Sequence, residues 1–81
     1  MKILYFAWLR ERIGTGREEV ETSAATPAAL VDELRAREPR YEAAFADLNV
    51  VRVALDQELS DWNAPLAGVT EVAFFPPMTG G

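Results

Sequence analysis

A run of hydrophobic residues covers positions 2–8, and its β-branched and aromatic side chains predict a strand. Both sets of alternating positions are apolar, so this strand is either central in its sheet or covered on both faces. One set holds Ile3, Tyr5 and Ala7, and the other holds Leu4, Phe6 and Trp8. A short helical turn is expected at 9–13, closed by the glycines that follow.

One long helix is expected after residue 26. Thr26 can cap it, and Pro27 suits the first helical position, where no amide hydrogen is needed. Apolar residues at 30, 31 and 34 form a stripe on one side, and Pro39 ends the helix. A shorter helix is expected at 41–48.

The other segments read as strands. We expect a charged second strand at 17–22, a third at 50–55, a short returning strand at 58–60 and a final strand at 71–75. This order predicts an α+β fold, a mixed sheet of four to five strands with one main helix packed on one face. The uncovered face should expose an apolar patch, and such patches usually bind partners. Alternation in the final strand directs Phe74 inward and Phe75 outward.

Residues 76–81 are expected to form an extended functional tail on a single domain of residues 1–81. Two prolines end the sheet ladder, and two glycines make the terminus thin. The tail, which spans roughly 20 Å when extended, suits insertion of the Gly81 carboxylate into a narrow active site on another protein. A partner that consumes ATP could activate this carboxylate for attack by a sulfur donor. Two terminal glycines also occur by chance or as cloning residues. The tail residues are Pro76, Pro77, Met78, Thr79, Gly80 and Gly81.

Composition narrows the possible chemistry. The 81 residues include neither cysteine nor histidine, which excludes thiol nucleophiles, zinc–thiolate sites and histidine bases. We therefore expect no bound cofactor or metal, and no self-sufficient enzyme. A net charge of −5 disfavours nucleic acid as a partner and suits proteins with basic docking surfaces. We expect no membrane span and no signal peptide, and hence a cytoplasmic protein.

The segment Glu71–Gly81 resembles the ending of the small subunit of molybdopterin synthase. Phe6-Ala7, followed by Arg10-Glu11 and Gly14, is similar to the opening strand and turn of that family, and Pro65-Leu66 also fits. The resemblance covers essentially the whole chain. One departure is the segment 67–70, where the family often has Asp-Gly-Asp.

The resemblance implies a ubiquitin-like β-grasp fold and a sulfur-carrier role. In this family an E1-like adenylating enzyme activates the terminal glycine with ATP, and a sulfur-donor enzyme supplies the sulfur of a covalent thiocarboxylate. The tail then enters the large subunit, where the active site lies and where sulfur passes to cyclic pyranopterin monophosphate to build the molybdopterin dithiolene. Two sulfurs per product require two loaded carriers, and the implied assembly is a heterotetramer.

The same resemblance assigns residue roles. Gly81 is the sulfur-bearing position and Gly80 its slim neighbour, while the rest of the tail contacts the partner. Phe75, Phe6 and Leu59 match positions on an apolar docking surface, and Arg10 matches a basic position near it. Core packing is the alternative for Phe6 and Leu59, and an ordinary surface charge is the alternative for Arg10.

Other functions remain open at this point. The chain could carry sulfur for thiamine or for a tungsten cofactor, or it could be a ubiquitin-like modifier of target lysines. A binding module that works only through its apolar face is a further alternative. The sequence does not distinguish molybdenum from tungsten, identify the sulfur donor or show whether the activating enzyme serves another pathway.

Overall fold

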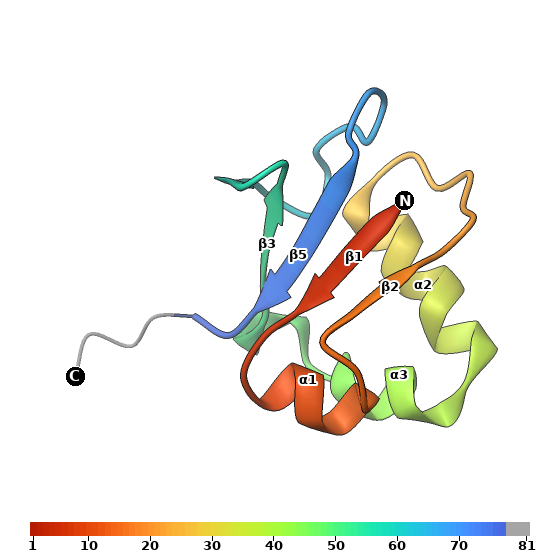
Figure 1. Ribbon diagram of the computed structural model, residues 1–81, viewed down its shortest axis with the longest axis vertical. Coiled ribbons are helices and arrows are strands. Elements are labelled where there is room, and N and C mark those ends of the chain that lie inside the picture. The colour runs from red at the N-terminus through yellow and green to blue at the C-terminus, as the bar shows by residue number, and fades with distance from the viewer. Residues whose placement is uncertain (78–81) are drawn as a thin grey trace.

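The computed structural model describes residues 1–77, and a mixed sheet is its central element (Figure 1). The strands run in the order β2-β1-β5-β3-β4; β1 is parallel to β5, and the other neighbours are antiparallel. This is the predicted β-grasp arrangement, and the fold prediction is confirmed. The strands are β1 Lys2–Tyr5, β2 Arg17–Glu19, β3 Arg52–Leu55, β4 Glu58–Leu59 and β5 Glu71–Phe75.

The helices are α1 Trp8–Ile13, α2 Pro27–Arg37 and α3 Pro39–Ala44, followed by a 3-10 turn, η1, at Leu48–Val50. The longest, α2, begins as predicted: the Thr26 hydroxyl accepts a hydrogen bond from the Ala29 amide at 3.2 Å, and Pro27 fills the first turn. Its apolar stripe is fully buried in the core that the strands share, at Leu30, Val31 and Leu34.

The core lies between the helices and one face of the sheet. Alternate strand residues point into it, among them Ile3, Tyr5, Val53, Val72 and Phe74. The Phe74 ring stacks on Tyr5 and on Trp62 with centroids 6.0 Å apart, and meets Phe45 edge-on at 5.0 Å. Aromatic pairs in these geometries add to the free energy gained from burial. The helices therefore fix which face of the sheet stays open.

Several predicted boundaries are wrong, among them the end of the second strand, which is Glu19 instead of residue 22. The first strand ends at Tyr5, because Ala7 has a positive φ of 54° and turns the chain, so that Trp8 begins α1 instead of extending the strand. Pro39 not only follows α2 but also begins α3, so the second helix covers 39–44 instead of 41–48. The 3-10 turn after it, in which the Asp47 carboxylate accepts from the Asn49 amide at 3.0 Å, delays β3 to Arg52.

Candidate functional site

The sheet ends where β5 meets the two prolines. The Phe6 amide donates to the Phe74 carbonyl at 3.1 Å, which extends the pairing of β1 with β5 by one residue. Pro76 and Pro77 follow and are half-buried, and without amide hydrogens they cannot continue the ladder. The chain leaves the sheet at the end opposite the N-terminus (Figure 1). The predicted tail positions Met78, Thr79, Gly80 and Gly81 lie outside the described residues.

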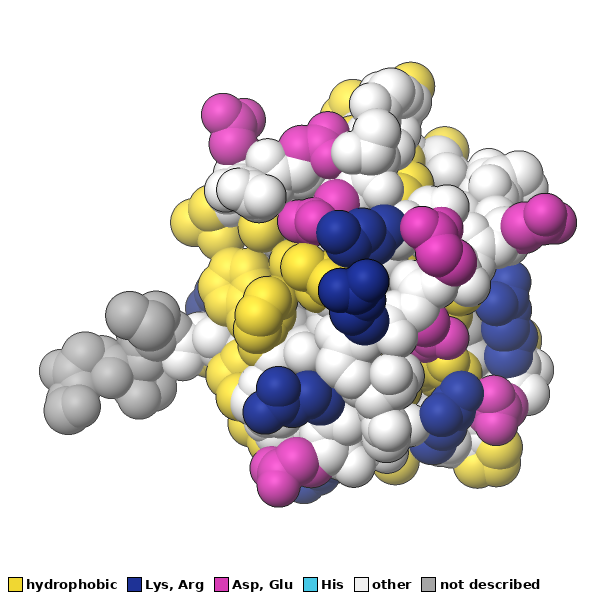
Figure 2. Space-filling model, in the orientation of Figure 1, with side chains coloured by type: hydrophobic (Ala, Val, Ile, Leu, Met, Phe, Trp, Pro, Cys, Tyr) yellow, Lys and Arg dark blue, Asp and Glu magenta, His cyan; other side chains and the backbone are white. Residues whose placement is uncertain are grey.

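The sheet face away from α2 is apolar, and we call it the open face; its members are Leu4, Phe6, Ala54, Leu59, Ala73 and Phe75. Strand register places Leu4 beside Ala73, Ala73 beside Ala54, and Ala54 beside Leu59. Residues directly opposite one another in neighbouring strands share a face, so one apolar row crosses four strands. Figure 2 shows this face, with hydrophobic side chains gathered in one patch.

The three apolar residues predicted for docking all lie on the open face. Phe6 is 46% exposed and Leu59 is 74% exposed, which excludes core packing for both. Phe75 is half-buried and, together with Phe6, lines a shallow hollow of about 400 Å³ whose floor is formed by the alanines. Exposed aromatic and aliphatic side chains grouped in this way are typical of an interaction site. Their docking role stays a prediction.

Arg10 lies apart from this row, on α1. Its side chain is exposed, and its stem runs close over Gly16, where a Cβ on the glycine would come within 2.9 Å of the arginine Cδ. Gly16 accepts a hydrogen bond from the Tyr5 amide at 2.9 Å, so Arg10 sits beside the end of β1. This position fits a basic group near the docking surface, and it also fits an ordinary surface charge.

Ala54 and Ala73 are site residues that sequence reasoning missed. Their small side chains make the floor of the hollow between Leu4 and Leu59. The alternation that directs Phe75 outward places Ala73 on the same side, so that signal was present. The same signal was present for Ala54, because the charged Arg52 two residues earlier lies on the outward set of positions and the apolar Val51, Val53 and Leu55 occupy the other set.

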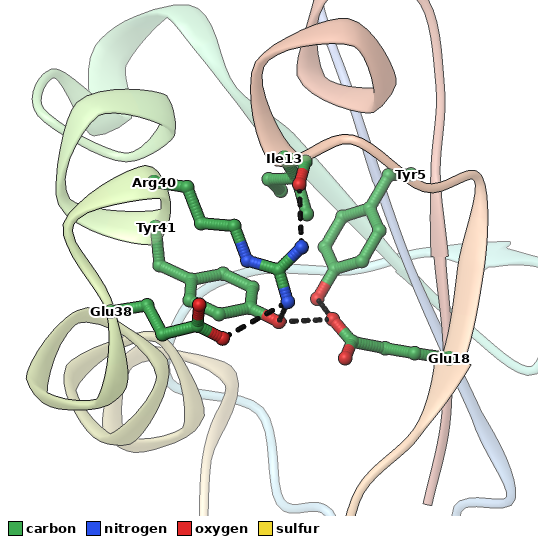
Figure 3. Close-up of polar contacts among 6 residues, drawn as sticks. All are labelled: Tyr5, Ile13, Glu18, Glu38, Arg40 and Tyr41. Carbon is green, nitrogen blue, oxygen red and sulfur yellow. Dashed lines mark hydrogen bonds and ion pairs between the residues drawn. The ribbon is translucent and has the colours of Figure 1, made fainter.

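A polar cluster lies on the core side of the sheet, at its β2 edge, between β1, β2 and α3 (Figure 3). The hydroxyls of Tyr5 and Tyr41 both donate to one carboxylate oxygen of Glu18, at 2.7 Å and 2.6 Å. Arg40 donates to the Tyr41 hydroxyl at 3.1 Å and to the Ile13 carbonyl at 2.8 Å. The cluster therefore ties the edge strand and the end of α1 to α3.

The hydrogen bonds of this cluster stabilise the fold. Burial, followed by the hydrogen bond to Glu18, raises the pKa of Tyr5 far above its ordinary value and raises the pKa of Tyr41 to about 12. Both hydroxyls therefore stay protonated near neutral pH and serve as hydrogen-bond donors, not as bases.

Within residues 1–77, no three His, Cys, Asp or Glu side chains are placed to hold a metal ion. In the same residues, no helix has the length and hydrophobicity to cross a membrane.

The sequence of this chain matches those of known sulfur-carrier proteins. The ThiS family model matches residues 3–81. The molybdopterin synthase sulfur carrier subunit of Escherichia coli (strain K12) is 40% identical over 81 residues, which cover all of this chain and 99% of that protein. These matches confirm the resemblance found in the sequence.

Solved structures agree in fold. The crystal structure of SAMP1 from Haloferax volcanii superposes with a TM-score of 0.77 at 29% identity, over all of this chain and 98% of the other. The crystal structure of H. volcanii small archaeal modifier protein 1 gives 0.76 at 26% identity, over 96% and 97% of the two chains.

Proposed function

The chain belongs to the ThiS family, and from this premise we propose that it is the sulfur-carrier subunit of a molybdopterin synthase. One observation carries the proposal. An apolar face that the protein's own helices leave uncovered extends to the end of β5, where the predicted tail leaves the sheet. A partner that covers the open face would therefore receive the tail beside the interface. The large subunit of the synthase is the proposed partner, and the proposed assembly is a heterotetramer.

The proposed chemistry takes place on the Gly81 carboxylate. Its oxygen attacks the α-phosphorus of ATP on an E1-like enzyme, pyrophosphate leaves, and an acyl-adenylate forms. Sulfur delivered at the sulfide level by a donor enzyme then attacks the acyl carbon, AMP leaves, and a thiocarboxylate remains. Glycine has no Cβ, so neither Gly80 nor Gly81 obstructs the attack. The family match, which extends to residue 81, supports this assignment.

The large subunit supplies the active site in this proposal, so the chain acts as a sulfur donor and not as an enzyme by itself. Met78 and Thr79 lie in the entering tail behind the prolines, while Phe6, Leu59 and Phe75 contact the partner's surface. Each thiocarboxylate delivers one sulfur to cyclic pyranopterin monophosphate, and two carriers complete the dithiolene. An ATP-dependent activating partner agrees with the expected cytoplasmic location.

Reconstitution tests the proposal. The thiocarboxylated chain, the purified large subunit and cyclic pyranopterin monophosphate should together produce molybdopterin, with two carriers consumed per product. The chain with an unmodified carboxylate is the matched control and should give no product. Failure of the loaded chain under conditions in which a known carrier succeeds would contradict the proposal and favour another sulfur pathway, such as thiamine or tungsten-cofactor synthesis.

A ubiquitin-like modifier is the second candidate, because the fold matches that of a small archaeal modifier protein. Attack by a lysine amine on the same acyl-adenylate would release AMP and form an isopeptide bond. Tagged chain expressed in its host would then appear in covalent conjugates that survive denaturation. Conjugates that disappear when Gly81 is deleted would support this second role, and their absence would leave sulfur transfer alone.

A further inference from the structure

The charges of the open face differ from the charge of the whole chain. The protein carries −5 overall, yet register places three cations on the strands of this face: Lys2, Arg17 and Arg52. Arg17 lies opposite Leu4 at the β2 edge, and Arg52 lies opposite Phe75 on β3. Figure 2 shows blue side chains directly beside the apolar patch.

Two acidic residues on the strands of this face each have an ion-pair partner. Glu71 forms an ion pair with Lys2 at 3.5 Å, and Glu19 forms one with the N-terminal ammonium of Met1 at 3.4 Å. Among residues 1–77, neither Arg17 nor Arg52 has a carboxylate within ion-pair distance. Both side chains are exposed. The open face therefore carries two uncompensated positive charges on either side of its apolar centre.

We infer that the partner covering the open face is a protein that presents carboxylates opposite Arg17 and Arg52, around an apolar centre. Charges that meet across an interface favour the correct encounter when their signs are complementary, and like charges penalise it. The strands that carry the two arginines are three strand spacings apart, so the partner's acidic positions lie roughly 15 Å from one another. The local charges therefore predict an acidic docking surface on the partner, whereas the net charge of the chain by itself predicts a basic one.

The inference rests on the proposed function, since the occupant is the large subunit of the synthase. In this proposal Arg17 and Arg52 take no part in the sulfur chemistry; they orient the carrier so that its tail approaches the channel of the large subunit. Their effect should appear mainly in the association rate, which electrostatic attraction raises and salt screens. Dissociation should depend more on the apolar centre.

The test measures association of the full-length chain with the purified large subunit of the same organism, at low and high salt. Arg17→Glu and Arg52→Glu should each slow association roughly tenfold at low salt, and the difference should shrink near 0.5 M salt. Arg37→Glu on α2, which packs against the other face, is the matched control, because it changes net charge equally and should alter the rate less than about twofold. Arg17→Gln and Arg52→Gln should give intermediate rates.

Each outcome is decisive. Unchanged or faster association of the Glu variants, with wild-type binding intact, would overturn the acidic-partner inference and leave the proposed function standing. If Arg37→Glu slowed association as much as Arg17→Glu and Arg52→Glu do, the change in net charge alone would explain the effect, and this result would also overturn the inference. Failure of the wild-type chain to bind the large subunit would overturn both the inference and the proposed function.

Discussion

Phe74 and Phe75 are neighbours in β5, yet they face opposite sides of the sheet: Phe74 is fully buried, whereas Phe75 lies half-exposed on the open face. Phe74 should therefore contribute mainly to stability and Phe75 mainly to docking. Phe74→Ala should lower the free energy of unfolding by about 3–5 kcal/mol, because it empties the centre of the core. Phe75→Ala should cost about 1 kcal/mol or less.

Binding should show the reverse order. Phe75→Ala is expected to weaken affinity for the large subunit at least roughly tenfold, since an aromatic anchor in a hollow is a typical hot spot. Urea denaturation and a binding titration, carried out on the same preparations of the two variants, measure the stability and the affinity. Normal affinity of a folded Phe75→Ala variant would remove Phe75 from the docking surface.

Alkaline pH should weaken the fold through the tyrosines of the polar cluster. The pKa values of Tyr5 and Tyr41 are raised in the folded state, so their contribution is complete below the unfolded value near 10 and is lost as pH rises through the folded values. For Tyr41 this window extends to about 12. The free energy of unfolding should fall by up to about 1.4 kcal/mol per pH unit for each tyrosine. In the Tyr41→Phe variant the free energy of unfolding should fall less steeply with pH. An equally steep fall in this variant would show that Tyr41 ionisation is not the cause.

Asp56 should stabilise the fold at neutral pH and cease to do so in acid. Its carboxylate accepts from the Thr70 hydroxyl at 2.8 Å, from the Thr70 amide at 3.1 Å and from the Glu71 amide at 3.0 Å, and these bonds lower its pKa. A lowered pKa adds stability above the unfolded value, and that stability disappears as pH falls through the folded value. Asp56→Ala should therefore lower the urea midpoint at pH 7 and bring it closer to wild type below about pH 3.8. A constant difference at all pH values would contradict this account.

Ala7 carries backbone strain, with φ of 54° and ψ of −133° between β1 and α1. An alanine Cβ disfavours this conformation, whereas glycine adopts it readily. Ala7→Gly should therefore raise the free energy of unfolding by about 1 kcal/mol. Gly68, which already has a positive φ of 80° and an unobstructed Cβ position, provides the converse control: Gly68→Ala should destabilise. No gain from Ala7→Gly would show that the turn is unstrained.

The sequence predicted what depends on local pattern. The bounds of β5, the cap of α2 at Thr26 and the opposite directions of Phe74 and Phe75 follow from alternation, helix periodicity and proline chemistry, and all three agree with the structure. The tail motif and the resemblance directed attention to Phe6, Leu59 and Phe75, which the fold brings to one face.

Features that depend on tertiary packing were not predictable. The turn at Ala7, an alanine in a conformation typical of glycine, has no local signal, so the hydrophobic pattern predicts a strand to Trp8 whereas β1 ends at Tyr5. Net charge gives no sign of the two arginines, because only the folded structure shows that Glu19 and Glu71 form ion pairs and that, within residues 1–77, Arg17 and Arg52 have no carboxylate partner. Long-range pairing decides such features.

Intact-protein mass spectrometry tests the central claim most directly. The chain is incubated with the host's E1-like enzyme, ATP and a sulfur donor, and its mass is compared with that of a chain lacking Gly81. The account predicts a mass gain equal to replacing one oxygen by sulfur, located at Gly81 by fragmentation and absent from the deletion variant. An unchanged mass, under conditions that load a known carrier, would contradict the sulfur-carrier function.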